Sequence, residues 1–298
     1  MATDGTIHTV AGNGEKIAEA GTVLAGTKGT DVALGAPNAV AVSPDGTVFI
    51  ADSLASRVYA LSADGTIEVR VTAELLGGPI ATINALAVSP SGSLFLADRE
   101  NSRIVEIPAE AGARPVSTSV PLPTGLAADA VGGVWISSAT SQLSRLQAGG
   151  VATIVGSSDG GWTADDRRPT ASPFNATAVS AGGNGVYIVD NLHRRVLQLV
   201  PDGRVSTAAD LPVDPFGTHD PVGLATSVTA GGPLYLVDTV GSRIFSIPAA
   251  AAGDIDPAEP VWPWIAGGAV AVPLVVLFLV IHRRQRTGGR GQVDAGSA

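Results

Sequence analysis

The chain repeats one sequence pattern along most of its length, and this repetition constrains the fold more than any other feature. Each copy reads as a strand, a glycine-containing turn, and a strand that usually ends in Asp. A short loop and a third strand, which usually opens with Arg, come next, and a fourth strand usually follows. The five copies begin at Ala36, Thr82, Leu122, Phe174 and Asp220.

A polar residue marks the end of the second strand in each copy, and the marks recur every ~40–50 residues, the period of a four-stranded propeller blade. The marks are Asp52, Asp98, Ser138, Asp190 and Asp238. The strands that they end carry β-branched and aromatic residues, as buried strands do. We therefore predict an all-β fold, a five-bladed β-propeller within residues 1–250, with six blades as the alternative.

The fifth copy lacks a fourth strand, because the residues after Ile247 read PAAAAGDIDPAEP and have no strand pattern. The segment Gly5–Gly12 (GTIHTVAG) is similar to the fourth strands expected at Gly65–Val71 and Gly150–Gly156. We expect this N-terminal segment to pair beside Arg243–Ile247, which would close the ring and remove an open edge.

The repeats resemble the NHL family. The resemblance rests on the runs AVSPDGTVFIADSLASRV and LAVSPSGSLFLADRENSRIVEI and on the loop DGGWTADDRRPTAS, and it covers roughly residues 5–248. It implies a propeller, but it is poorly specific for function. NHL-type propellers include protein-binding, RNA-binding and ligand-sensing modules, and similar propellers serve as lyases and lactonases.

Four copies place Arg five residues after the marking Asp, and two interpretations compete. The residues could form a ring of acids around the central channel, or each pair could brace its own loop. In the third copy Ser138 replaces Asp and Leu143 replaces Arg, and this joint loss favours a bracing pair. The pairs are Asp52 with Arg57, Asp98 with Arg103, Asp190 with Arg195, and Asp238 with Arg243.

No catalytic constellation stands out. The chain has no cysteine, and its four histidines show no metal-binding spacing. It also lacks a GxSxG elbow, a P-loop and a dinucleotide-binding fingerprint. We predict no cofactor and no metal. The absence of a catalytic motif favours a protein that is not an enzyme, and a metal-dependent hydrolase or lyase is the alternative.

The longest connections between predicted blades lie on the same face as the short loops after the marks. Aromatic and Arg residues, which are enriched at binding hot spots, occur in two of these connections. Trp162 could instead pack beneath its own loop, and the Asp residues lack EF-hand spacing for calcium. The candidate binding residues are Trp162, Asp165, Asp166, Arg167, Arg168, Phe216 and His219.

The formal net charge of −9 disfavours nucleic-acid binding. Trp264–Ile281 holds eighteen residues without a charge, about 27 Å of helix and enough to cross a bilayer core. We predict a linker at 251–263, this transmembrane helix, and a basic cytoplasmic tail at 282–298.

Acidic residues before that helix and four Arg after it place the propeller outside the cell membrane, although MATDGTIHTV is not a signal peptide. The sequence favours a membrane-anchored binding module for a protein, peptide or cell-envelope glycan. A sensory domain with a separate signalling partner is a further alternative.

Overall fold

The structure is a computed structural model of the whole chain. Within the described residues, all strands belong to small β-sheets, and a single 3-10 turn, Gly29–Asp31, precedes the first of them. The prediction of an all-β fold is confirmed. The residues that the structure describes are 8–15, 21–80, 82–110, 112–140, 142–147, 150–155, 176–182, 185–191, 193–199, 205–211, 221–226, 234–238, 243–247 and 253–254.

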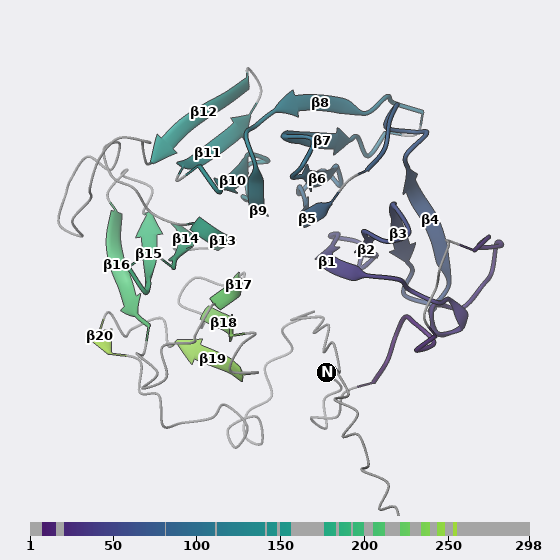
Figure 1. Cartoon of the computed structure of the whole chain (residues 1–298), viewed down its shortest axis with the longest axis horizontal. Helices are drawn as coiled ribbons and strands as arrows, with labels where there is room; N and C mark the ends of the chain where they lie inside the picture. Colours follow the sequence, from purple (N-terminus) through teal and green to yellow (C-terminus); the bar gives the residue numbers. More distant parts are fainter. Residues whose placement is uncertain are drawn as a thin grey trace, which may run out of the picture.

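The strands form successive antiparallel sheets, which we call blades 1 to 5 (Figure 1). Blade 1 contains β1 (Pro37–Val42), β2 (Val48–Asp52), β3 (Arg57–Leu61) and β4 (Ile67–Thr72). Blade 2 contains β5 (Ile83–Val88), β6 (Leu94–Asp98), β7 (Arg103–Ile107) and β8 (Val116–Ser119). Blade 3 contains β9 (Pro123–Ala128), β10 (Val134–Ser138), β11 (Gln142–Gln147) and β12 (Gly150–Val155). Blade 4 contains β13 (Ala176–Gly182), β14 (Gly185–Asp190), β15 (Arg195–Leu199) and β16 (Val205–Asp210). The described strands of blade 5 are β17 (Pro221–Thr226), β18 (Leu234–Asp238) and β19 (Arg243–Ile247).

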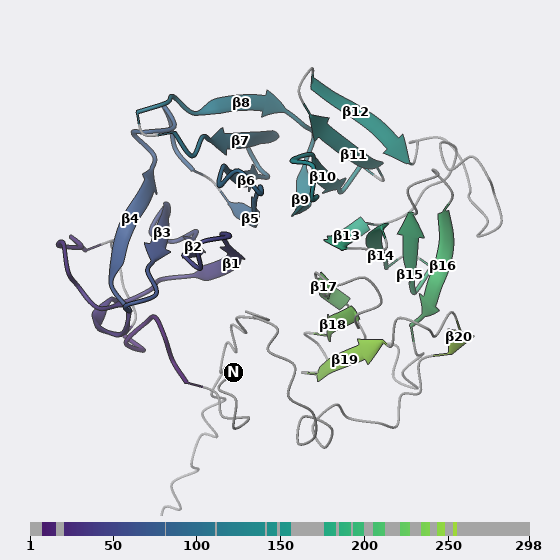
Figure 2. The same cartoon turned by 180° about the vertical axis from the view of Figure 1, so that it is seen from behind.

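The blades stand around a common centre, with the first strand of each innermost (Figures 1 and 2). Each inner strand packs against the next: β1 against β5, β5 against β9, β9 against β13, and β13 against β17. Each predicted mark, from Asp52 to Asp238, is the last residue of the second strand of its blade. The repeat therefore gave the strand boundaries because one polar residue ends an apolar run in every copy.

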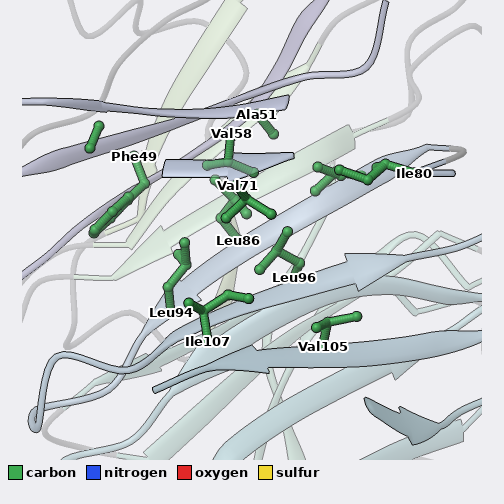
Figure 3. Close-up of a cluster of buried hydrophobic side chains, with 12 residues drawn as sticks. Phe49, Ala51, Val58, Val71, Ile80, Leu86, Leu94, Leu96, Val105 and Ile107 are labelled. Atoms are coloured by element: carbon green, nitrogen blue, oxygen red, sulfur yellow. The ribbon is translucent and has the colours of Figure 1, made fainter. Parts of the chain in front are cut away.

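Apolar side chains fill the spaces between neighbouring blades. Figure 3 shows the cluster between blades 1 and 2, where Phe49 and Val58 of blade 1 lie in the same core as Leu86 and Leu96 of blade 2. Equivalent clusters join blades 2 and 3, 3 and 4, and 4 and 5. Because sheets between two neighbours are covered on both faces, their second strands read as nearly continuous apolar runs.

The face of blade 1 that points away from blade 2 is covered by the residues before β1. Ile50, Tyr59 and Ile67 form a buried cluster there, and Val23, Val32, Leu34 and Ala11 pack against it. We call residues 8–15 and 21–36 the N-terminal strap. Its backbone is held in place by hydrogen bonds from Gly12 N–H to Gly29 O and from Ile67 N–H to Thr27 O, both 2.9 Å.

The strap corrects the prediction of a closing strand. Of the segment Gly5–Gly12, residues 8–12 are described, and they form no strand and lie on blade 1 rather than beside β19. The physical reason is the hydrophobic effect. The apolar side chains of the strap bury the face around Ile50 and Tyr59, which would otherwise be in contact with water.

After blade 5, the two residues of β20 (Gly253–Asp254) pair in parallel with Ala209 and Asp210 of β16. This pairing lies within the predicted linker 251–263, for which we had expected no strand. Trp264–Ile281 and the tail 282–298 lie outside the described residues. Within the part of the chain that the structure describes, no helix is long and apolar enough to cross a membrane.

Candidate functional site

The polar residues that mark the repeats all lie on one face of the ring, which we call the loop face. There the inner strands begin, the second strands end and the third strands begin, as the pairing of Pro37 with Asp52 in blade 1 shows. Ile83 pairs with Asp98 in the same way in blade 2, and Ala176 with Asp190 in blade 4. The opposite side, which carries the tight turns between first and second strands, is the turn face.

In blade 1 the marking carboxylate binds backbone rather than arginine. Asp52 is fully buried, and its Oδ2 accepts the N–H of Gly35 at 2.7 Å, while its Oδ1 accepts those of Ala36 at 2.8 Å and Ala55 at 3.1 Å. Arg57 donates instead to the carbonyl of Gly21 in the strap, at 2.6 Å. The expected Asp52–Arg57 pair is therefore replaced by two separate contacts: Asp52 holds the entry to β1, and Arg57 holds the strap at Gly21.

Burial against the strap also changes the pKa of Tyr59, which lies close to Asp52 and Arg57. Tyr59 is almost completely buried. Burial raises the pKa of the Tyr59 phenol above its usual value near 10, and the negative charge of Asp52 raises it further, whereas Arg57 opposes both effects. The covered face of blade 1 is therefore a region of low polarity around Tyr59.

In blade 2 the carboxylate does bind its arginine. Oδ2 of Asp98 accepts a hydrogen bond from Nε of Arg103 at 2.8 Å and another from Nδ2 of Asn101, also at 2.8 Å. The Asn101 amide then donates to the carbonyl of Pro79, at 3.0 Å. The pair thus braces the loop after β6 against the connection that leads into β5.

In blade 4 a histidine joins the same arrangement. Asp190 is fully buried, and its Oδ2 accepts from Nε of Arg195 at 3.1 Å and lies 2.8 Å from Nδ1 of His193. The imidazole remains 37% exposed on the loop face. A carboxylate that binds one ring nitrogen fixes the orientation of the ring and leaves the other nitrogen directed elsewhere. Sequence reasoning missed this contact, although the Asp-x-x-His spacing within one loop was a signal for it.

In blade 3 a serine performs the bracing role. Ser138 Oγ donates to the carbonyl of Pro121, accepts the N–H of Thr140 at 3.2 Å, and lies 2.7 Å from the Thr140 hydroxyl. The residue opposite Ser138 in the sheet is Gln142, so Gln142 replaces Arg here, and not Leu143 as the sequence spacing had suggested. Leu143 is a buried core residue instead.

The loops of blades 1, 2 and 4 share one backbone geometry. Ser56, Ser102 and Arg194, which directly precede the arginines, adopt left-handed φ angles of 48°, 48° and 53°. Two of these residues hold the connection to the next blade: Ser102 O accepts the N–H of Val120 at 3.0 Å, and Arg194 O accepts that of Leu211 at 2.7 Å. A left-handed non-glycine residue persists only where its surroundings hold it, so the loops are rigidly presented.

The seven candidate binding residues, Trp162, Asp165, Asp166, Arg167, Arg168, Phe216 and His219, lie outside the described residues. One connection runs from β12 of blade 3 to β13 of blade 4, the other runs from β16 of blade 4 to β17 of blade 5, and both have one end in blade 4 on the loop face. One connection leads to Ala176, which pairs with Asp190, and the other leaves after Asp210, which pairs with Arg195. Asp238 and Arg243 pair in register in blade 5, and their side chains are not described. Among the described residues, no group of three His, Asp or Glu could hold a metal ion.

The turn face carries a polar cluster that sequence reasoning did not find. Asp129 Oδ2 accepts from Nε and Nη2 of Arg145, at 2.9 and 2.6 Å, and from Nε1 of Trp135 at 3.1 Å. The guanidinium also lies 5.4 Å from the centre of the Trp135 ring. Because the three side chains satisfy one another, we interpret this cluster as a brace for the turn after β9 and not as a binding site.

Comparison with known proteins agrees with this architecture. No protein-family model and no curated protein sequence matches the chain. A streptogramin B lyase structure aligns with 71% of this chain at 19% identity and a TM-score of 0.53. A nidogen/laminin complex aligns with 74% of this chain and 78% of its own, at 15% identity and a TM-score of 0.56. The chain is a β-propeller. A virginiamycin B lyase from Staphylococcus aureus also matches the propeller, over 72% of this chain and 67% of its own, at 17% identity and a TM-score of 0.53. The match spans 65% of the streptogramin B lyase, less than two thirds of its length.

Proposed function

We propose that the chain is an NHL-type propeller of five blades that acts as a non-catalytic binding module. In this proposal the loop face engages a protein, a peptide or a cell-envelope ligand. Trp264–Ile281 anchors the propeller in a membrane, with the propeller outside and the C-terminus in the cytoplasm. The uncharged segment and the four Arg that follow it support this orientation.

One observation carries the proposal: the repeated acidic side chains of the loop face already form hydrogen bonds with groups next to them in the propeller. Asp52, Asp98 and Asp190 are buried, and their carboxylates bind backbone N–H groups or side chains of their own loops. Such carboxylates hold loops in place instead of meeting a substrate. A preorganised loop surface lowers the entropic cost of binding, and this suits a recognition module.

A propeller-type hydrolase or lyase is the second candidate, because of the His193–Asp190 contact. An exposed imidazole whose other nitrogen meets a buried carboxylate is an arrangement found in acid–base and metal sites. Two of the similar structures are also lyases by description. Activity that depends on a bound metal, with metal found by elemental analysis of the purified full chain, would favour this candidate over the binding module.

The binding function predicts a large effect at Trp162. We expect Trp162→Ala to weaken capture of the partner from solubilised membranes by about 2 kcal/mol or more, because a buried aromatic anchor contributes that much to an interface. The measurement is affinity for the captured partner, with thermal melting of the variant beside it. The control is Val131→Ser, because Val131 is 84% exposed but lies on the turn face. A variant that melts early and still captures the partner would show that Trp162 only packs its loop.

The membrane orientation predicts the accessibility of the strap. The chain has no cysteine, so Leu24→Cys introduces a single thiol at a side chain that is 69% exposed. We expect a membrane-impermeant maleimide to label this thiol in intact cells, because the propeller lies outside. Ile50→Cys, at a buried position, is the matched control and should stay unlabelled before denaturation. Labelling of Leu24→Cys only after lysis would place the propeller in the cytoplasm.

A further inference from the structure

Arg99 lies at the start of the loop that follows β6 in blade 2. It directly follows Asp98, and its Nε is inaccessible to solvent and has no hydrogen-bond partner. No carboxylate among the described residues lies within ion-pair distance of its guanidinium. A partly buried guanidinium without a counter-charge is costly, because desolvation weakens its hydration and nothing in the blade offsets that loss.

The position of Arg99 is set by the repeat. Its N–H donates to the carbonyl of Thr82, just before the inner strand of blade 2, at 3.0 Å. Ser53 and Ala139 make the same bond at the same repeat position, to Ala36 at 3.1 Å and to Leu122 at 3.0 Å. Blades 1 to 3 thus place the first residue of this loop beside the start of the inner strand. Because β5 is the inner strand of blade 2 (Figure 1), the backbone of Arg99 lies on the loop face beside the start of an inner strand.

A second unpaired polar atom occupies the equivalent position in the neighbouring blade. Ser53 Oγ of blade 1 is also buried and has no hydrogen-bond partner. Arg99 offers a planar fork of N–H donors, and Ser53 offers a hydroxyl that donates or accepts. The repeat therefore places two polar atoms without a hydrogen-bond partner at equivalent positions of adjacent blades.

The acidic groups around Arg99 are engaged elsewhere. Oδ2 of Asp98 binds Arg103, and Oε1 of Glu100 accepts from the Thr82 hydroxyl at 3.2 Å. Oδ1 of Asp98 is buried and lacks a partner, but the charge of this carboxylate is matched by Arg103. The positive charge of Arg99 is thus the one on this loop that no contact within the blade balances.

We propose that Arg99 binds an anionic group, a carboxylate or a phosphate, of the ligand that the loop face recognises. This inference rests on the proposed binding function and narrows it to acidic ligands. A guanidinium holds either group through two parallel hydrogen bonds, which a single positive point charge cannot reproduce. The acidic propeller repels anions at long range, but salt screens this repulsion beyond about 8 Å in physiological buffer, whereas a direct contact persists.

The test uses the full chain in detergent and two polyanions, an oligogalacturonate as the source of carboxylates and an inorganic polyphosphate as the source of phosphates. We expect one of them to bind in isothermal titration. Arg99→Gln should weaken this binding by about tenfold or more, the usual effect of losing a charge-assisted fork. Arg99→Lys should lose most of it as well, because a lysine lacks the fork.

Arg114→Gln is the matched control, because it removes the same charge from the same blade. Arg114 is exposed and lies in the connection between β7 and β8, on the turn face, so its loss should change the affinity less than about twofold. Melting temperatures of the variants show whether folding is intact. Failure of both polyanions to bind, or equal weakening by Arg99→Gln and Arg114→Gln, would overturn the inference.

Capture from membranes separates this inference from the proposed function. If the wild-type chain and Arg99→Gln capture the same partner equally well, the loop face is a binding module and the role of Arg99 is wrong. If the wild-type chain captures nothing while Arg99-dependent binding of a polyanion persists, Arg99 is an anion site and the partner-binding function fails instead.

Discussion

Replacing Asp52 with alanine is expected to lower the free energy of unfolding by about 3–4 kcal/mol. The carboxylate is fully buried and accepts the N–H groups of Gly35, Ala36 and Ala55. Its removal leaves three donors without an acceptor where water does not reach. Each unsatisfied buried donor costs about 1–3 kcal/mol, and partial relaxation of the loop reduces the sum.

Asp64→Ala is the control for this prediction, because Asp64 also accepts a backbone N–H and a hydroxyl, both from Thr66, at 2.9 and 2.7 Å. Asp64 is exposed at the turn between β3 and β4, so water replaces the lost acceptor and the loss should stay below about 1 kcal/mol. Both values come from denaturant titration. Equal losses in the two variants would show that Asp52 does not hold the entry to β1.

Asp52→Ala should also speed up amide hydrogen exchange near the substitution more than elsewhere in the propeller. Gly35 and Ala36 connect the strap to β1, so their amide protons should exchange with solvent faster in the variant than in the wild type. The amides of blade 3, which blade 2 separates from blade 1, should retain their protection until global unfolding. Uniform loss of protection would indicate that the propeller unfolds as one unit and that Asp52 has no special role at this end.

The strand boundaries followed from the sequence because they depend on local chemistry that recurs. In each copy an apolar run ends at one polar residue, and Asp98 and Asp190 show why: both end a second strand and bind the arginine that opens the third. The same spacing failed in blade 1. There the strap adds Gly21 as an acceptor for Arg57, and the backbone around Gly35 takes Asp52.

The errors at the ends of the ring have one physical cause. The repeat pattern shows only what all copies have in common. Blade 1, however, packs against the N-terminal strap, which the repeat pattern does not include. The segment Gly5–Gly12 resembles a fourth strand in sequence, yet its described residues, 8–12, help to cover the outer apolar face of blade 1. The repeat also predicted which loops share the loop face.

The repeat did not predict a role for Arg99, because an arginine occurs at this position in one copy only. Blades 1 and 3 carry Ser53 and Ala139 there.

Replacing Gly125 with valine is expected to destabilise the propeller by about 3 kcal/mol, the upper part of the usual range for an overpacked core. Gly125 lies in β9, which packs against β13 of the next blade. A Cβ atom at this position would lie 2.7 Å from the hydroxyl of Ser137 and 3.3 Å from the backbone nitrogen of Val179. Ser137 is buried, so it has little room to move, and the Val179 backbone belongs to the neighbouring sheet.

The hydrogen bonds at this contact explain why the two strands lie so close. The Thr124 hydroxyl donates to the carbonyl of Ala176 at 2.9 Å and lies 3.0 Å from Ser137 Oγ, so it links blade 3 directly to blade 4. A larger residue at Gly125 would push the blades apart and stretch this link. Thr124→Val removes the bond with little change in volume and should cost only about 1 kcal/mol. The difference between the two variants separates steric crowding from hydrogen bonding.

Gly78→Val is the matched control for Gly125→Val, because nothing lies within 4 Å of a Cβ atom built at Gly78 and its φ is not left-handed. It should change stability by less than about 0.5 kcal/mol, as surface substitutions usually do. The free energy of unfolding is measured by denaturant titration for Gly125→Val, Thr124→Val and Gly78→Val. Gly125→Ala, which adds a smaller side chain, is measured beside them. Because both long connections have one end in blade 4, which packs against blade 3, Gly125→Val should weaken ligand capture as well as stability. Unchanged stability in Gly125→Val would mean that adjacent blades tolerate separation, and that the rigid loop face on which the binding proposal depends does not exist.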